Sequence, residues 1–187
     1  MRETSSAMLA KLMFTVRVLW IAFVVAALIY AFVAWMSAGS PDRPYVDRGP
    51  LLADPLFFGL ALAAVAAAIA GRVVPQRFLS PARLRAEAQK DLVIHLARDT
   101  RFEPADIATI AALPESEQRT FKLYGPWQTA MVIGWACDET VALCGLILAF
   151  LRHDPGLYAP FGAVSILLLL LAKPRPDDLL TLVRANA

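Results

Sequence analysis

The chain has 187 residues, of which 58% are hydrophobic and 18% are charged. Soluble domains average about 45–50% apolar and ~25% charged residues, so this composition argues against a soluble globular protein and for a membrane protein. The formal net charge is only +2, so the placement of the charges along the chain is more informative than their total.

Four apolar stretches are candidate membrane spans, and we expect an all-α, polytopic fold in a lipid bilayer, with two hairpins of transmembrane helices. The first stretch is longer than the ~7–15 apolar residues of a signal peptide, which indicates an uncleaved anchor. We divide the chain into a first hairpin (1–74), a cytoplasmic helical segment (75–126) and a second hairpin with a short tail (127–187). The expected spans are Leu12–Met36, Leu56–Val74, Trp127–Leu151 and Leu157–Ala172.

Lys and Arg residues predict the orientation of these spans. Fifteen of the 18 lie before or at the start of the first span, from the end of the second span to the third span, or in the tail. The exceptions are Arg43, Arg48 and Arg152. Both termini and the middle segment are therefore expected to be cytoplasmic. The Ala- and Arg-rich composition favours a bacterial inner membrane.

The middle segment is expected to be helical. Ser80-Pro81 is a typical helix start, and apolar residues recur at helical spacing from there to about Arg98. Two short helices, at 104–112 and 114–123, follow, and Gly125-Pro126 is expected to separate the last of them from the third span. The segment is too small for its own core. It either lies on the membrane surface or packs on a partner or on the rest of this chain.

The two hairpins show a possible internal repeat. Trp20 and Trp135 coincide at an offset of 115 residues, and several Ala and Leu residues coincide with them. A parallel duplication would explain the matches, and such repeats occur in membrane proteins. Chance matching in Ala- and Leu-rich helices explains them equally well.

Asp138 and Glu139 are adjacent acids inside the third span. Glu139 is the thirteenth of the 25 residues in that span and is therefore expected near the bilayer midplane. An ionised carboxylate there costs roughly 2.5–3.5 kcal/mol on insertion scales, so intramembrane acids are functional candidates. No Lys or Arg in another span lies at the same depth, so no charge partner within the chain is obvious, and a partner protein is a candidate source of the counter-charge.

Small residues predict how the second and third spans pack, because they let two backbones approach closely. Gly134 and Gly145 share a face of the third span with Asp138, so that acid is expected in a helix–helix contact;. The second span offers a small-residue face that includes Gly59 and Ala63. We predict tight pairing of these two spans.

The acids have three possible roles. They hold the helices or a partner together by hydrogen bonds in a protonated state, they bind a proton or another cation, or they have no function. We favour the first of these roles over ion binding.

Residues 131–150 read MVIGWACDETVALCGLILAF, which resembles the carboxylate-bearing helix of the proteolipid rotor subunits of rotary ATPases. In that family a mid-helix acid binds the transported ion, and the resemblance places Glu139 in that role. Leu113-Pro114-Glu115 is similar to the family's cytoplasmic loop. This chain differs in having about 50 residues between the two spans, two additional spans, no repeated glycines and the additional acid Asp138. It is also similar to uncharacterised small bacterial four-helix membrane proteins, a likeness that implies no activity.

Other chemistry-bearing residues give no site. Cys137 and Cys144 lie within the third span, where they are interpreted as helix filling;. His95 and His153 are expected on opposite sides of the membrane and cannot share a haem. No catalytic triad, phosphate-binding loop or redox motif is present in the sequence. We therefore expect no enzyme, metal, cofactor or nucleic-acid partner.

The sequence favours a non-catalytic accessory or scaffold subunit of a larger inner-membrane complex. Its expected partners are other membrane subunits or further copies of the chain. The alternative is a proton- or cation-binding subunit of a transport or rotary complex, in which Glu139 carries the ion and Asp138 tunes it.

Overall fold

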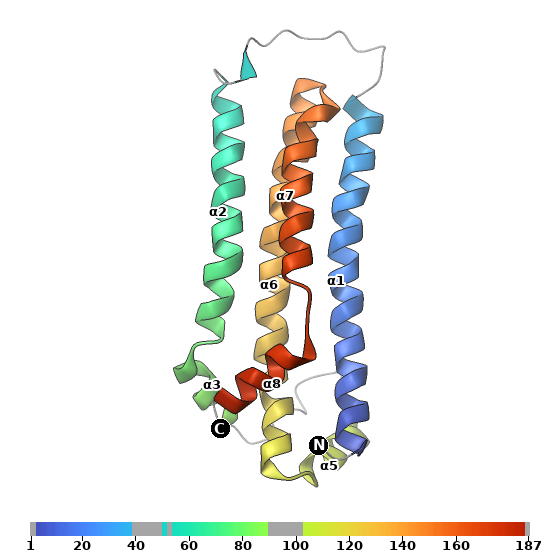
Figure 1. The fold of residues 1–187 in the computed structure, drawn as a ribbon, viewed down its shortest axis with the longest axis vertical. Coiled ribbons are helices and arrows are strands. Elements are labelled where there is room, and N and C mark those ends of the chain that lie inside the picture. Colours follow the sequence, from blue (N-terminus) through green and yellow to red (C-terminus); the bar gives the residue numbers. More distant parts are fainter. Residues whose placement is uncertain (1–2, 39–49, 52–53, 90–102, 186–187) are drawn as a thin grey trace. The chain divides into compact units, whose positions relative to one another are not determined.

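A computed structural model describes residues 3–38, 50–51, 54–89 and 103–185, and within these ranges the structure is helical with no strand (Figure 1). The all-α prediction is confirmed for this part of the chain. The helices are α1 (Glu3–Ala38), α2 (Pro55–Phe78), α3 (Pro81–Ala88), α5 (Pro104–Ala111), α6 (Glu115–Arg152), the 3-10 turn η2 (Pro155–Leu157), α7 (Tyr158–Leu171) and α8 (Pro176–Ala185).

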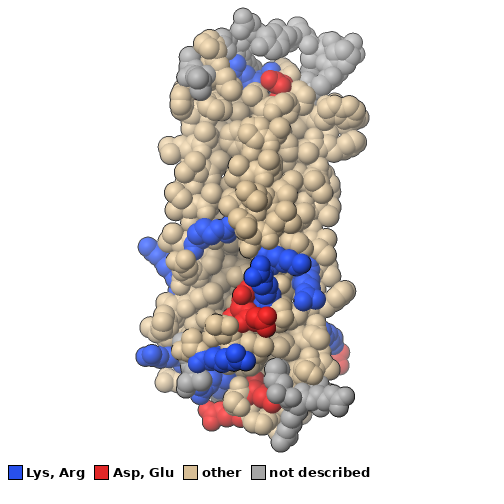
Figure 2. Space-filling model, viewed as in Figure 1, with Lys and Arg blue, Asp and Glu red and all other residues tan. Residues whose placement is uncertain are grey.

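Three of these helices are long and apolar enough to cross a membrane: α1, α2 and α6. The fourth expected span, η2 with α7, reaches that length only when it is joined to α8 across a short break. The chain is thus a multi-pass membrane protein with three or four candidate spans. Figure 2 shows a wide surface zone that carries no Lys, Arg, Asp or Glu side chain, as a lipid-facing surface requires;.

The chain forms two compact units. The first unit consists of Met1–Val18, Pro75–Met131 and Pro174–Ala187, and the second of Leu19–Val74 and Val132–Lys173. The units do not coincide with the segments 1–74, 75–126 and 127–187, because α1 and α6 each run through both units.

The first unit has a hydrophobic core of its own. Leu84 of α3, Ile110 of α5 and Trp127 of α6 are almost completely buried. The hydroxyl of Tyr124 donates a hydrogen bond to the carbonyl of Leu12 in α1 at 3.1 Å. The structure therefore shows that the described part of the middle segment packs on the rest of this chain, which is one of the surroundings expected for it.

Gly125-Pro126 does not separate two helices, so that prediction was wrong. Helix α6 is continuous through Pro126, although proline removes one backbone hydrogen bond from a helix interior;. Tyr124 and Trp127, on either side of it, are buried to 1% exposure or less. Tertiary packing of these aromatic rings outweighs the local preference of the Gly-Pro pair.

The other predicted helix starts agree with the structure. Helix α3 begins at Pro81 after Ser80, which is its N-cap residue, and α5 begins at Pro104. The predicted continuation of the first of these helices to Arg98, including His95, lies outside the described residues.

In the second unit α6 contacts both α2 and α7. Ala64 of α2 forms a small core cluster with Val141 and Cys144 of α6. A Cβ atom built on Gly145 would lie 2.5 Å from Cβ of Phe161 in α7, so this glycine is needed for the close approach of α6 and α7. The predicted pairing of the second and third spans is present, and Gly145 instead packs against the fourth.

Two of the four predicted packing residues lie elsewhere. Gly59 and Ala63 are exposed, and a Cβ built on Gly59 meets no atom within 4 Å. The face of α2 that contacts α6 instead carries Ala64, Ala67 and Gly71. The prediction for Gly59 and Ala63 was wrong because small residues occur on every face of this Ala-rich helix, so their spacing does not select one.

A tight turn joins α6 to α7. His153 has a φ of 53°, and the amides of His153 and Asp154 bond back to the carbonyls of Phe150 and Ala149. This is a Schellman-type helix end with His in the position that usually holds glycine. Beside it, Arg152 pairs with Asp54, which caps the start of α2, at 2.7 Å.

We predict opposite effects of alanine at two glycines. Gly145→Ala forces a methyl group against Phe161 and should lower the free energy of unfolding by about 1–3 kcal/mol;. Gly59→Ala, the matched control, should leave it unchanged or raise it by up to about 1 kcal/mol;. Thermal unfolding of the detergent-solubilised protein measures both. Equal destabilisation by the two variants would contradict the described α6–α7 contact.

Candidate functional site

The candidate site is built around the C-terminal end of α7. The last carbonyl groups of a helix have no amide partner within it, and in an apolar environment each unsatisfied group costs several kcal/mol. The amides of Ala172 and Lys173 bond to the carbonyls of Leu168 and Leu170. The carbonyls of Leu169 and Ala172 need other donors.

Three other helices donate side-chain hydrogen bonds to this end. The indole N–H of Trp20 in α1 donates to the carbonyl of Leu169 at 2.8 Å. The indole N–H of Trp135 in α6 donates to the carbonyl of Ala172 at 3.0 Å. From α2, Arg72 donates to the carbonyl of Leu168 at 3.4 Å. These three donors tie α1, α2 and α6 to the end of α7.

Arg72 also forms an ion pair with Asp138. Its guanidinium lies 3.2 Å from a carboxylate oxygen of Asp138, whose side chain is fully buried. The Arg72 side chain is 41% exposed. A positive charge beside a helix C-terminus is favourable, because the helix dipole is negative there. The guanidinium is thus stabilised by both the carboxylate and the end of α7.

Gly71 allows this pair to form. A Cβ atom built on Gly71 would lie 3.2 Å from the carbonyl oxygen of Gly134 and 3.2 Å from a carboxylate oxygen of Asp138. The backbone of α2 therefore approaches α6 closely at this level, and the adjacent Arg72 reaches the acid. The expectation that no Lys or Arg of another span lies level with the acids was wrong, because Arg72 of α2 supplies the counter-charge of Asp138.

Glu139 has a partner on a different helix. The hydroxyl of Tyr30 in α1 donates a hydrogen bond to a carboxylate oxygen of Glu139 at 2.7 Å. The adjacent acids thus point to different neighbours: Asp138 faces α2 and Glu139 faces α1. Neighbouring positions on a helix are about 100° apart, which accounts for this divergence.

Some buried polar atoms of the second unit lack a hydrogen-bond partner. Within the described part of the chain, the second carboxylate oxygen of Asp138 and the hydroxyl of Ser165 are buried and make no hydrogen bond. A buried polar group that lacks a partner usually costs about 1–3 kcal/mol, so such groups need an explanation.

The arrangement is suited to holding helices together and to binding charge. It combines a carboxylate–guanidinium pair, a second carboxyl held by a phenol, and backbone carbonyls that accept side-chain hydrogen bonds.

No protein-family model matches this chain, and neither the curated proteins nor the solved structures contain a match.

The sequence identified the acids but not their partners. Asp138 and Glu139 are both in the site, and Gly134 lies at its edge. The sequence did not predict the contacts that Trp20 and Arg72 make with the end of α7. For Trp20 a signal was present in its coincidence with Trp135 at an offset of 115 residues, since both indoles donate to the end of α7.

Removing one indole donor should destabilise the second unit. Trp20→Phe keeps the ring but leaves the Leu169 carbonyl without its donor, so we expect a loss of about 1–3 kcal/mol in the free energy of unfolding;. Trp35→Phe, at a position that is 64% exposed, is the control and should change it little. Chemical unfolding in mild detergent compares the two. Identical curves for both variants would refute the capping role of Trp20.

Proposed function

We propose that this protein is a non-catalytic accessory or scaffold subunit of a larger membrane complex. The observation that carries the proposal is an exposed apolar stripe on α1 with a seven-residue repeat. Its members, spaced alternately four and three residues apart, are Ile21, Val25, Leu28, Phe32 and Trp35.

The stripe has the spacing of a helix–helix contact. Large apolar residues at alternating spacings of four and three form the seam by which two helices pack in a left-handed pair. Each of the five residues is between 43% and 64% exposed. Lipid chains accept apolar residues on any face and need no such repeat. The partner we propose is therefore a transmembrane helix of another subunit.

The difference in burial between the helices supports this role. Only 11% of the most apolar stretch of α1, and of α2, is buried within the chain, against 44% for α6. Helix α6 is thus the internal element, and α1 and α2 offer surface to other helices. The acids of α6 already have Arg72 and Tyr30 as partners. The proposed subunit contact consequently uses the apolar surface of α1 instead of the acids.

The distribution of Lys and Arg supports an orientation with both termini in the cytoplasm. The setting we propose is a bacterial inner membrane.

A photo-crosslinking amino acid at Phe32 tests the proposed contact in native membranes. We expect a crosslink to one defined membrane polypeptide, which co-purifies with the unmodified protein in mild detergent. The control position is Leu62 of α2, which is 71% exposed and lies outside the stripe. A probe there should give only weak or diffuse products.

Three outcomes of this experiment differ in meaning. A defined heterologous product at Phe32 supports the accessory role, and the identity of the partner names the complex. A product between two copies of the chain replaces it with a homo-oligomer. Equal yields at Phe32 and Leu62, with a monomeric native mass, would refute the proposal.

A second candidate is a proton- or cation-binding subunit. The specific observation in its favour is the buried, unpartnered oxygen of Asp138 beside the carboxyl of Glu139. The resemblance of residues 131–150 to a rotor helix points to the same acids, with Glu139 as the ion carrier. Tyr30 and Arg72 would then hold the two acids in position.

Carbodiimide labelling tests this second candidate. A hydrophobic carbodiimide should modify Glu139 at a rate that falls as pH or cation concentration rises. Glu139→Gln should abolish the labelling, while the variant assembles normally because Tyr30 can still donate to the amide oxygen. Asp138→Asn is the matched control and should keep the label. Labelling that is indifferent to pH and cations would contradict an ion site.

A further inference from the structure

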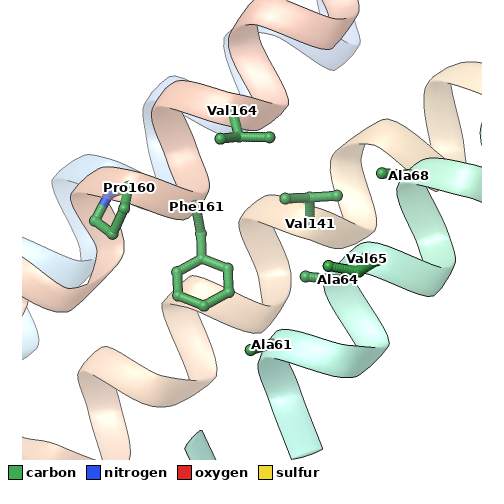
Figure 3. A pocket seen from close by; sticks show the side chains of 8 residues that line it. All are labelled: Ala61, Ala64, Val65, Ala68, Val141, Pro160, Phe161 and Val164. Carbon is green, nitrogen blue, oxygen red and sulfur yellow. The ribbon is translucent and has the colours of Figure 1, made fainter. Parts of the chain in front are cut away.

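The second unit has an apolar groove that the proposed function does not use. Figure 3 shows it between α2 and α7, with Val141 of α6 among its lining side chains and the ring of Phe161 projecting from α7. Its volume is about 240 Å³. Val65 of α2 and Val164 of α7 line it and are 55% and 47% exposed, so the groove opens to the surroundings of the protein.

The positively charged side chain of Arg72 follows this groove along α2. Ala61, Ala64, Val65 and Ala68 line it from α2, and Arg72 follows one turn after Ala68 on the same helical face;. From Ala61 to Arg72 the helix advances ~16 Å. Arg72 donates to the carbonyl of Leu168, one turn beyond Val164 in α7, so the guanidinium bridges the two helices just past the apolar section.

Arg72 retains capacity for a further anion. A guanidinium has five N–H donors, and the bonds to Asp138 and Leu168 engage one terminal nitrogen each. The side chain is 41% exposed. Exposed Lys173 follows two residues after the end of α7 and adds a second positive charge to this region of the unit.

We propose that the groove between α2 and α7 binds one anionic phospholipid, with an acyl chain against Ala64, Val65 and Val164 and the phosphate on Arg72. A hydrophobic slot that ends at a cation between two membrane helices matches the two halves of such a lipid. A partner helix or a second copy would fill the apolar section but would leave the remaining N–H donors of the guanidinium without a second anion.

The apolar half of the site is tested by filling the groove. Val164→Trp places a large ring at its rim, and Leu167→Trp, at an exposed position of α7 that does not line the groove, is the matched control. Native mass spectrometry of the full chain from nanodiscs containing phosphatidylglycerol counts the retained lipids. We expect one retained lipid in the wild type and in the control, and about a tenfold lower retention in Val164→Trp.

The charged half is tested by changing the balance of charge around Arg72. Asp138→Asn leaves the guanidinium without its internal counter-ion and should strengthen the preference for phosphatidylglycerol over phosphatidylcholine. The double variant Arg72→Gln/Asp138→Asn removes both charges together. It should lower that preference about tenfold relative to the wild type, which corresponds to the binding free energy of one charge-assisted hydrogen bond. Arg77→Gln, an exposed cation on the opposite face of α2, should not change it.

The outcomes are decisive in either direction. Loss of retention in Val164→Trp together with loss of lipid preference in the double variant establishes the site. Equal retention in Val164→Trp and Leu167→Trp, or an unchanged preference in the double variant, overturns it. A dimer that Val164→Trp dissociates would assign the groove to a second copy and also overturn the lipid site. None of these results depends on the crosslinking partner of α1.

Discussion

The need to satisfy the carbonyl groups at the end of α7 is the constraint on which the second unit depends. Helix α7 has 14 residues and ends at Leu171, so its terminal carbonyls require donors that water would supply in a soluble protein;. Trp20, Arg72 and Trp135 provide them from three different helices. The short helix α7 thereby fixes the positions of the other helices through directional hydrogen bonds. Packing of apolar side chains alone supplies no such directionality.

The ion pair between Arg72 and Asp138 adds a second link at the same end. A buried charge is expensive to leave alone, so the pair specifies which faces of α2 and α6 meet more strongly than it stabilises the fold. Gly71 makes the close approach possible. The polar groups are thus concentrated on the inner faces of the unit, while the outer faces of α1 and α2 remain apolar and unspecialised for charge. The polar groups therefore hold the helices of the unit together, and the apolar outer faces contact the surroundings of the protein.

Hydropathy was sufficient to predict the helical class and the approximate candidate spans, because few structures other than a membrane-spanning helix accommodate a long apolar run. It did not predict contacts. The depth expected for Glu139 rests on a span that starts at Trp127, whereas α6 begins at Glu115 and α2 continues past Pro75 to Phe78. Span limits read from composition therefore misjudged which residues lie level with one another, and Arg72 was overlooked. Small residues failed as a guide for a related reason: every face of α2 contains them, and only the three-dimensional packing distinguishes Gly71 from Gly59.

The long sequence separations in the polar cluster have a consequence for biosynthesis. Arg72 precedes Asp138 by 66 residues, and Trp20 precedes Leu169 by 149. At ~5–20 residues per second, a ribosome delivers the counter-ion of Arg72 roughly 3–13 s after the arginine itself. During that interval the guanidinium of Arg72 and the indole of Trp20 lack the partners that they have in the folded protein. The helices made first therefore need a setting in which the side chain of Arg72 can extend toward water until Asp138 has been synthesised.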